Sequence, residues 1–147
     1  MAKLVDEQVS QAENELGVLD IPITSTPEMF ATLGLDTSSA GPNLRVEFNY
    51  TLQYSFVRSA SVLISVYRGE GADAVLVFQT EQSIPAPSTK GNHTVYRAPI
   101  SSNGVDYLPP NTDFIIYQAF VSSPEHSKHA KLTRIGPESF AARAYSD

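Results

Sequence analysis

Residues Leu44–Phe56 constrain the fold more than any other segment, because apolar and polar side chains alternate there without a fault. The apolar positions are Leu44, Val46, Phe48, Tyr50, Leu52, Tyr54 and Phe56. Successive side chains of a β-strand project to opposite faces of a sheet, so a period of two buries one face and leaves the other in water. A helix would spread the same residues around its axis. The segment is therefore predicted to be one long strand, or a strand bent at a bulge.

Further strands follow at the spacing typical of a β-sandwich or barrel. They are predicted at residues 21–24, 29–35, 61–68, 74–80, 93–98, 113–121, 131–135 and 138–145. Segments with turn-forming residues separate them, among them Ser101–Gly104. The connections are short and carry no helical pattern, so the strands should pair antiparallel. The expected fold class is all-β, an antiparallel two-sheet sandwich.

Residues 3–16 carry the one helical pattern in the sequence. Its apolar members are Val5, Val9, Ala12 and Leu16. They fall three or four residues apart, and Gly17 follows as a stop signal. So narrow a stripe is marginal as an isolated helix in water. Residues 1–18 are therefore expected to form a helical or disordered N-terminal arm, either frayed or docked on a neighbouring copy, and residues 19–147 to form the sandwich domain.

Three segments carry a resemblance to a known fold. They are Met29-Phe30-Ala31-Thr32-Leu33 before the long strand, the turn Leu108-Pro109-Pro110-Asn111-Thr112-Asp113-Phe114, and the closing Ser139-Phe140-Ala141-Ala142-Arg143-Ala144-Tyr145. Over residues 20–147 their order resembles the tumour-necrosis-factor-like jelly-roll family. Chains of this kind also look like the jelly-roll proteins of bacterial spore surface layers. The resemblance implies a jelly roll that assembles into trimers or filaments.

The turn Leu108–Phe114 is also similar to the turn into the sixth strand of fibronectin type III domains. In those domains an aromatic residue at this point forms a tyrosine corner, whereas this chain has Phe114, which carries no hydroxyl. The chain also contains no Trp. The jelly roll is favoured over the fibronectin type III arrangement for these reasons.

Strands 61–68 and 113–121 carry apolar residues on both faces. A two-layer sandwich buries only one face of each sheet, so the second face needs a cover. Either another subunit or the chain's own loops and N-terminal arm would supply it. The candidate interface residues are Val5, Val9, Leu16, Tyr67, Ile115, Tyr117 and Phe120.

The net charge of −6 makes nucleic acid an unexpected partner, since phosphate backbones would be repelled. No apolar stretch has the length of a membrane-spanning helix, so no membrane insertion is expected. The start of the sequence lacks the order of a secretory signal. We therefore expect cytoplasmic synthesis, followed on the spore-layer resemblance by deposition on a spore or particle surface. The absence of cysteine excludes disulfides and thiolate chemistry.

Catalytic and metal-binding patterns are weak in this sequence. It contains no Gly-x-Ser-x-Gly motif, and His126 and His129 stand beside Glu125 and Lys128 in what reads as a solvated loop. Carboxylates in turns, such as Glu70 and Asp73, are typical of turn chemistry. No catalytic residue, metal or cofactor is therefore predicted.

Two functions remain in view. The first is a non-enzymatic structural or interaction protein that self-assembles as a homo-oligomer, a trimer or larger. The alternative is a carbohydrate- or ligand-binding sandwich module, with a glycan stacked on a tyrosine. The tyrosines considered for that role are Tyr67, Tyr96, Tyr107 and Tyr117.

Overall fold

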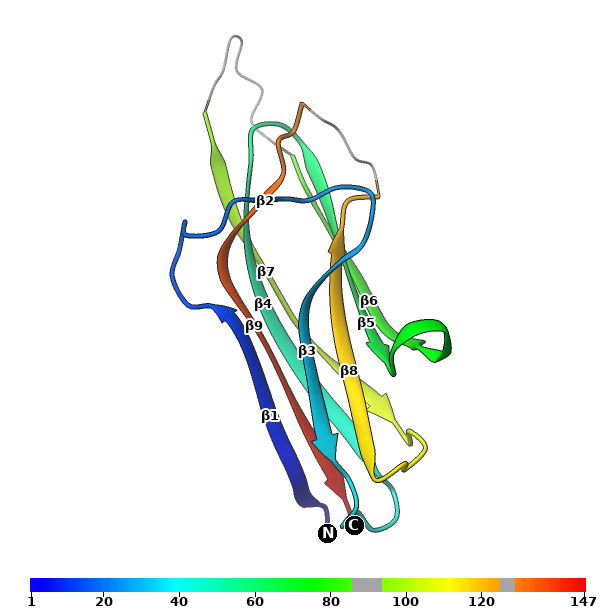
Figure 1. Ribbon diagram of the computed structural model, residues 1–147. Coiled ribbons are helices and arrows are strands. Elements are labelled where there is room, and N and C mark those ends of the chain that lie inside the picture. The colour runs from blue at the N-terminus through cyan, green and yellow to red at the C-terminus, as the bar shows by residue number, and fades with distance from the viewer. Residues whose placement is uncertain (86–93, 125–128) are drawn as a thin grey trace.

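The computed structural model describes residues 1–85, 94–124 and 129–147, and these form nine strands in two facing layers (Figure 1). The strands are β1 (Lys3–Glu13), β2 (Ile21–Pro22), β3 (Glu28–Asp36), β4 (Arg45–Phe56), β5 (Ala60–Arg68), β6 (Val75–Ile84), β7 (Tyr96–Tyr107), β8 (Phe114–Ser122) and β9 (Thr133–Ser146). A single 3-10 turn over Gly71–Asp73 is the one helical element among them. Residue 93, the predicted start of one strand, lies outside the described residues.

The strand order identifies an antiparallel jelly roll. One sheet has the order β1-β9-β4-β7, with β2 also pairing with β9, and the other has the order β3-β8-β5-β6. Within the sheets, β1 pairs with β9, β3 with β8, β4 with β7 and β5 with β6. This nested pairing of eight strands is that of a jelly roll, and the predicted two-sheet sandwich is confirmed. Fibronectin-like sandwiches instead place the first strand beside the second, and here it lies beside the last.

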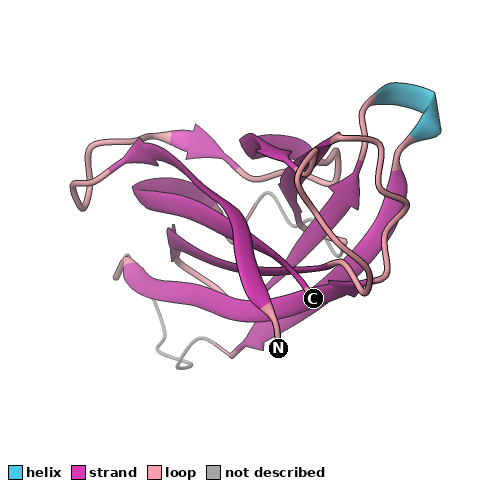
Figure 2. Ribbon diagram, turned by 90° about the horizontal axis from the view of Figure 1, so that it is seen from below, coloured by secondary structure: helices cyan, strands magenta, loops and turns pink. Residues whose placement is uncertain are grey.

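The core fills the space between the two sheets, which Figure 2 shows end-on. Every second residue of β4 is buried, as the alternation over residues 44–56 predicts. The Phe48 ring lies 6.0 Å from the Phe140 ring and 5.5 Å from the Phe78 ring, so one side chain joins β4, β9 and β6. Burying an aromatic side chain of this size contributes about 1.5–3 kcal/mol to stability, so these contacts hold the two sheets together.

The helical arm predicted for residues 3–16 is wrong, because residues 3–13 form β1 at the edge of a sheet. Lys3 pairs with Ser146 and Glu13 with Glu138, through two register irregularities. Beyond the strand, the backbone N–H of Gly17 donates to the carbonyl of Ile135 at 2.8 Å. Pairing with β9 satisfies the backbone groups on one side of this edge strand, which is more than a marginal isolated helix offers. Both termini consequently lie at one end of the molecule (Figures 1 and 2).

Two predicted strand boundaries are also wrong. Residues 101–104 lie inside β7 and not in a turn, and Gly104 is there because Phe48 and Phe78 leave no room for a Cβ atom. The strands predicted at 131–135 and 138–145 form one continuous β9. A register irregularity opposite Leu52 and Tyr54 accommodates Gly136 and Pro137 within it.

Candidate functional site

The outward faces of the two sheets differ in chemistry. On the β1-β9-β4-β7 sheet, β4 presents only polar side chains outward, namely Arg45, Glu47, Asn49, Thr51, Gln53 and Ser55. They are half-buried, and Arg45 lies 5.1 Å from the centre of the Tyr145 ring while pairing with Glu47. The outward side of β4 is polar, as expected on the water side of a sheet, although the Gln53 Oε1 atom is buried without a hydrogen-bond partner among the described residues.

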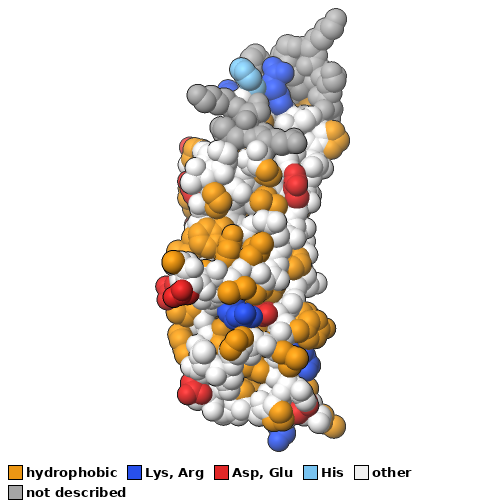
Figure 3. All heavy atoms as spheres, turned by 90° about the vertical axis from the view of Figure 1, so that its right-hand side faces the viewer, with side chains coloured by type: hydrophobic (Ala, Val, Ile, Leu, Met, Phe, Trp, Pro, Cys, Tyr) orange, Lys and Arg blue, Asp and Glu red, His pale blue; other side chains and the backbone are white. Residues whose placement is uncertain are grey.

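The β3-β8-β5-β6 sheet carries hydrophobic side chains on its outer side. We call this set the apolar face, and its members are Met29, Leu63, Tyr67, Leu76, Phe114, Ile116 and Phe120. The side of the molecule that bears β5 and β6 shows hydrophobic side chains gathered along its middle (Figure 3). The two central strands add only uncharged groups between them, such as Ser65 and Gln118. A patch of this composition on a chain of net charge −6 is unusual for a surface that faces only water.

The register of the strands holds the apolar face together. Phe120 of β8 pairs with Ser65 of β5, and its ring meets the Tyr67 ring edge-on at 5.6 Å between centroids. Further along β8, the Phe114 ring lies directly over Gly34 of β3, where an added Cβ would collide with it. Cross-strand aromatic contacts of this kind stabilise a sheet by roughly 0.2–1 kcal/mol each. The Tyr67 and Phe120 rings therefore support each other, whereas Phe114 is held only from below, by Gly34.

The structure divides the predicted interface residues. Tyr67 and Phe120 are half-buried members of the apolar face. Ile115 and Tyr117 point the other way, into the core, so a neighbour could not reach them without unfolding the sandwich. Their assignment to an interface is therefore wrong, and the period-two alternation of β8 explains it.

The three N-terminal interface residues also differ from one another. Val5 packs against the core, whereas Val9 is 60% and Leu16 51% exposed. Val9 lies in β1 opposite Ala141 and so belongs to the sheet edge. Val9 and Leu16 are available to a neighbour, but from a paired strand and its connection to β2 and not from a free arm.

A buried polar cluster lies beneath one end of the apolar face. The Arg68 Nη1 atom lies 2.7 Å and 2.9 Å from the two carboxylate oxygens of Asp106, and Tyr117 donates its hydroxyl to Asp106 at 2.8 Å. Burial and the neighbouring Asp106 carboxylate raise the pKa of Tyr117 far above its ordinary value. The carboxylate is thus neutralised by partners on β5 and β8, and the cluster ties the two sheets together.

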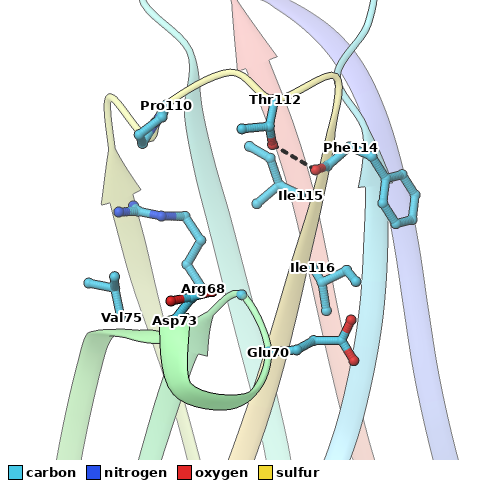
Figure 4. Close-up of a pocket in the computed structure, with 10 residues that line it drawn as sticks. Arg68, Glu70, Asp73, Val75, Pro110, Thr112, Phe114, Ile115 and Ile116 are labelled. Atoms are coloured by element: carbon cyan, nitrogen blue, oxygen red, sulfur yellow. Dashed lines mark hydrogen bonds between the residues drawn. The ribbon is translucent and has the colours of Figure 1, made fainter.

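Arg68 also borders a surface pocket of about 340 Å³ (Figure 4). The turn between β5 and β6 brings Glu70 and Asp73 to it, and the β7–β8 connection brings Pro110 and Thr112. Thr112 donates its hydroxyl to the Phe114 carbonyl at 2.8 Å, which fixes that connection. The Arg68 guanidinium is occupied by Asp106, so the pocket offers no ready charge for an anion.

Sequence reasoning missed this cluster, although a signal for it is present. Asp106 lies an even number of residues after the buried Ala98 and Ile100 of β7, so it points to the core as they do. Arg68 stands in the same relation to the buried residues of β5, which are Val62, Ile64 and Val66. Two opposite charges in core phase on different strands indicate a buried ion pair, since a lone buried charge is costly. The other buried pair, Arg134 with Glu138, lies within one strand, β9.

The remaining chemical candidates are not brought together. The segment Glu125–Lys128 lies outside the described residues. Among residues 1–85, 94–124 and 129–147, no group of three metal-ligating side chains is close enough to share an ion. Tyr107 is 73% exposed at the end of β7, Tyr96 packs on Phe56 at 5.7 Å, and Tyr117 is in the core. Within the same described segments, no helix has the length and apolarity needed to span a bilayer.

No protein-family description matches the sequence, and no curated protein matches it. Among solved structures the chain is similar to murine APRIL at 13% identity and a TM-score of 0.42, covering 96% of this chain and 98% of that one. It is similar to the Eiger TNF of S. frugiperda at 12% identity and a TM-score of 0.44, covering 95% of this chain and 92% of that one. It is also similar to dimeric latent PorU from Porphyromonas gingivalis at 14% identity and a TM-score of 0.43, covering 97% of this chain but only 13% of that one. At these TM-scores the similarities decide nothing about function, which is argued from the chain's own residues.

Proposed function

We propose that this protein is a non-enzymatic structural protein that self-associates through the apolar face of its β3-β8-β5-β6 sheet. The observation that carries the proposal is the chemistry of that face. Its central strands present Leu63, Tyr67, Ile116 and Phe120 with no charged side chain between them. A second copy of the chain fits the two central strands, because two acidic molecules would meet there without opposing like charges, while Asp36 of β3 and Glu81 of β6 lie on the same side at the edges.

The size of the face supports a second copy as its occupant. Four strands spaced about 4.8 Å apart span about 19 Å, and nine residues of strand extend about 30 Å. One copy would therefore bury roughly 570 Å² and two copies about 1,100 Å², which exceeds the 1,000 Å² or so that a specific interface needs. The estimate is for full overlap of two apolar faces, and contact of the apolar face with a different surface reaches it only where that surface matches it in size.

The surface that the apolar face contacts on the next copy decides how many copies assemble. Two apolar faces packed together form a self-complementary contact that closes as a dimer. A trimer or lattice instead requires the face to meet a different surface. The β1 edge is suited to that role, since Leu4 and Val9 are more than half exposed on it. We favour this second arrangement, in line with the trimer or surface layer that the jelly-roll resemblance implies.

The proposal includes no catalytic role. The buried ionic groups of the described residues, Arg68 with Asp106 and Arg134 with Glu138, are engaged with each other. Cytoplasmic synthesis and deposition on a spore or particle surface complete the proposal, and electron microscopy of concentrated protein would show whether layers or filaments form.

Light scattering coupled to size-exclusion chromatography tests the interface. The parent chain should elute as a trimer or larger, Phe120→Asp as a monomer, and Thr51→Asp, on the polar sheet face, as the parent. Because Phe120 also contacts Tyr67, Gln118→Lys is the second variant, with Thr51→Lys as its control. Gln118→Lys adds a charge to the centre of the face without removing a packed ring.

A parent that stays monomeric at millimolar concentration would overturn the proposal. So would Phe120→Asp and Gln118→Lys variants that both keep the parent's mass. If the parent is a dimer and these variants are monomers, the apolar face is still the interface, but the two faces pair with each other and no trimer forms. Deleting residues 1–18 would not be a clean test, because it removes β1 and uncovers the edge of β9.

A further inference from the structure

A polar pocket lies between the edges of the two sheets, away from the apolar face. It is bounded by β6, the last strand of one sheet, and β7, the last strand of the other. Its volume is about 310 Å³, and its lining residues are Thr80, Gln82, Pro99, Ile100, Ser101 and Ser102. A volume of this size is at the lower end of the range for small-molecule sites.

The strand register points several polar side chains into this pocket. Thr80 and Gln82 pair with Ile64 and Val62 of β5, which are buried, so both project toward the interior from β6. On the other wall, Ser102 pairs with Tyr50 of β4, and the two project to the same inner side. The hydroxyl and amide groups of opposite sheets thus face each other across the opening.

Two buried polar atoms at this place have no hydrogen-bond partner among the described residues. They are the Gln82 Oε1, on a residue of the lining, and the Tyr50 Oη, on a residue that lies outside the lining but pairs with Ser102. Tyr50 is 1% exposed. Burial raises the pKa of the Tyr50 phenol to about 12, and the nearby Ser102 hydroxyl lowers it slightly. The Tyr50 hydroxyl still has no hydrogen-bond partner among the described residues. An unsatisfied buried polar atom costs about 1–3 kcal/mol, so a group that supplied hydrogen bonds here would be bound favourably.

The chemistry of the lining restricts what that group can be. None of the six lining side chains is ionisable, so a charged ligand would lose its hydration without gaining a counter-charge. Hydroxyl groups both donate and accept, and the Gln82 Oε1 accepts. Pro99 and Ile100 add an apolar patch for C–H groups. A neutral molecule with several hydroxyl groups satisfies all of these.

We propose that the β6–β7 pocket binds a neutral polyhydroxylated small molecule, a single sugar residue being the class that fits best. The site is separate from the proposed self-association surface, and each can be tested without the other. Its determinants in the lining are the Gln82 amide and the Ser102 hydroxyl, with the Tyr50 hydroxyl behind Ser102 as a second layer, and Thr80 and Ser101 form the rim.

The test is a nuclear magnetic resonance titration of the ¹⁵N-labelled chain. The probes are D-glucose, D-galactose, D-mannose, L-rhamnose and N-acetyl-D-glucosamine, each added up to about 100 mM. A sugar that binds should give saturable shifts confined to the amides of β6 and β7, with a Kd on the order of 1 mM or tighter. Gln82→Leu and Tyr50→Phe should each weaken binding about tenfold, whereas Gln11→Leu, on exposed β1, should leave it unchanged.

Tyr50→Phe keeps the ring and removes only the unpartnered oxygen, so it keeps the test meaningful if Gln82→Leu fails to fold. The absence of saturable shifts with all five sugars would overturn the proposal. Saturable shifts that persist in both variants would do the same, since binding would then lie elsewhere. A high-resolution structure with only ordered water in the pocket after soaking would assign these atoms to bound water instead.

Discussion

The Tyr117 hydroxyl donates a 2.8 Å hydrogen bond to the Asp106 carboxylate across the core, from β8 of one sheet to β7 of the other. Arg68 neutralises the same carboxylate from β5. The two sheets are therefore joined by a polar link as well as by apolar packing. The cost of breaking the link depends on which member is removed.

Asp106→Ala should lower the free energy of unfolding by about 2–4 kcal/mol, because it leaves Arg68 and Tyr117 without their acceptor. Tyr117→Phe should cost only about 1 kcal/mol, since Arg68 still pairs with the carboxylate. Urea denaturation measures both. Glu47→Ala, which breaks an exposed pair with Arg45, is the control and should change stability by less than about 1 kcal/mol. Equal losses for Asp106→Ala and Glu47→Ala would contradict a structural role for the cluster.

Alkaline pH should unfold the protein through its buried tyrosines. Burial raises the pKa of Tyr50 and of Tyr54 to about 12, and that of Tyr117 further, from an ordinary value of 10.0. Below pH 10 both states are protonated and stability is unaffected. Above it the unfolded chain loses protons first, so stability falls as pH rises, by on the order of 4 kcal/mol per pH unit for three such groups.

Tyrosinate absorbance and near-ultraviolet circular dichroism, recorded on the same samples from pH 9 to 13, test this. The last part of the absorbance rise should coincide with loss of the dichroism signal. Complete ionisation of all seven tyrosines while the dichroism stays native would show that these phenols are accessible.

The Arg134–Glu138 pair on β9 should be a point of high sensitivity. Arg134 donates to both carboxylate oxygens of Glu138 at 2.6 Å and 2.5 Å, and the Glu138 side chain is fully buried. Arg134→Met alone should cost about 3–5 kcal/mol, because an unpaired carboxylate remains inside the protein. The double variant with Glu138→Leu should regain most of that loss. Thermal melts of the two variants should therefore differ widely, and a double variant no more stable than the single one would argue against this explanation.

Two glycines in neighbouring sheets provide a matched comparison. A Cβ at Gly104 would collide with the Phe48 ring in the core, and one at Gly34 would collide with the Phe114 ring on the surface. Phe114 is 55% exposed and can rotate away, whereas Phe48 is enclosed. Gly104→Ala should therefore cost about 1–3 kcal/mol and Gly34→Ala less than 1 kcal/mol. Chemical denaturation gives both values, and the reverse order would contradict the packing described.

The sequence was most informative where a strand has one wet and one buried face. Residues 44–56 show this, because β4 is central and its inner side chains all enter the core. The segment 3–16 misled because β1 is an edge strand with little burial on either side, so its apolar residues carry no period of two. Its conformation is fixed by β9, more than a hundred residues away in the chain, which no local pattern can report.

The candidate surface was predictable only in part. The apolar character of strands 61–68 and 113–121 on both faces is visible in the sequence and led to Tyr67 and Phe120. Deciding that Ile115 and Tyr117 face inward needs the phase of the alternation in β8, which its pairing with β5 fixes. The β6–β7 pocket could not be foreseen, since it depends on the separation between two strands that belong to different sheets.

The nested pairing of the strands also sets the order in which the chain can mature. Among the described strands, β5 and β6 are the one sheet-bonded pair that are consecutive in the chain. Each further pair encloses the one before it, and β1 is completed only by β9, which is made after all the other described strands. Folding should therefore nucleate at the β5–β6 hairpin and proceed slowly outward, as is usual when partners are distant in sequence. A nascent chain would carry one open edge of β4 until β9 emerges, so this protein should depend on β9 being made before its hydrophobic strands meet those of another chain.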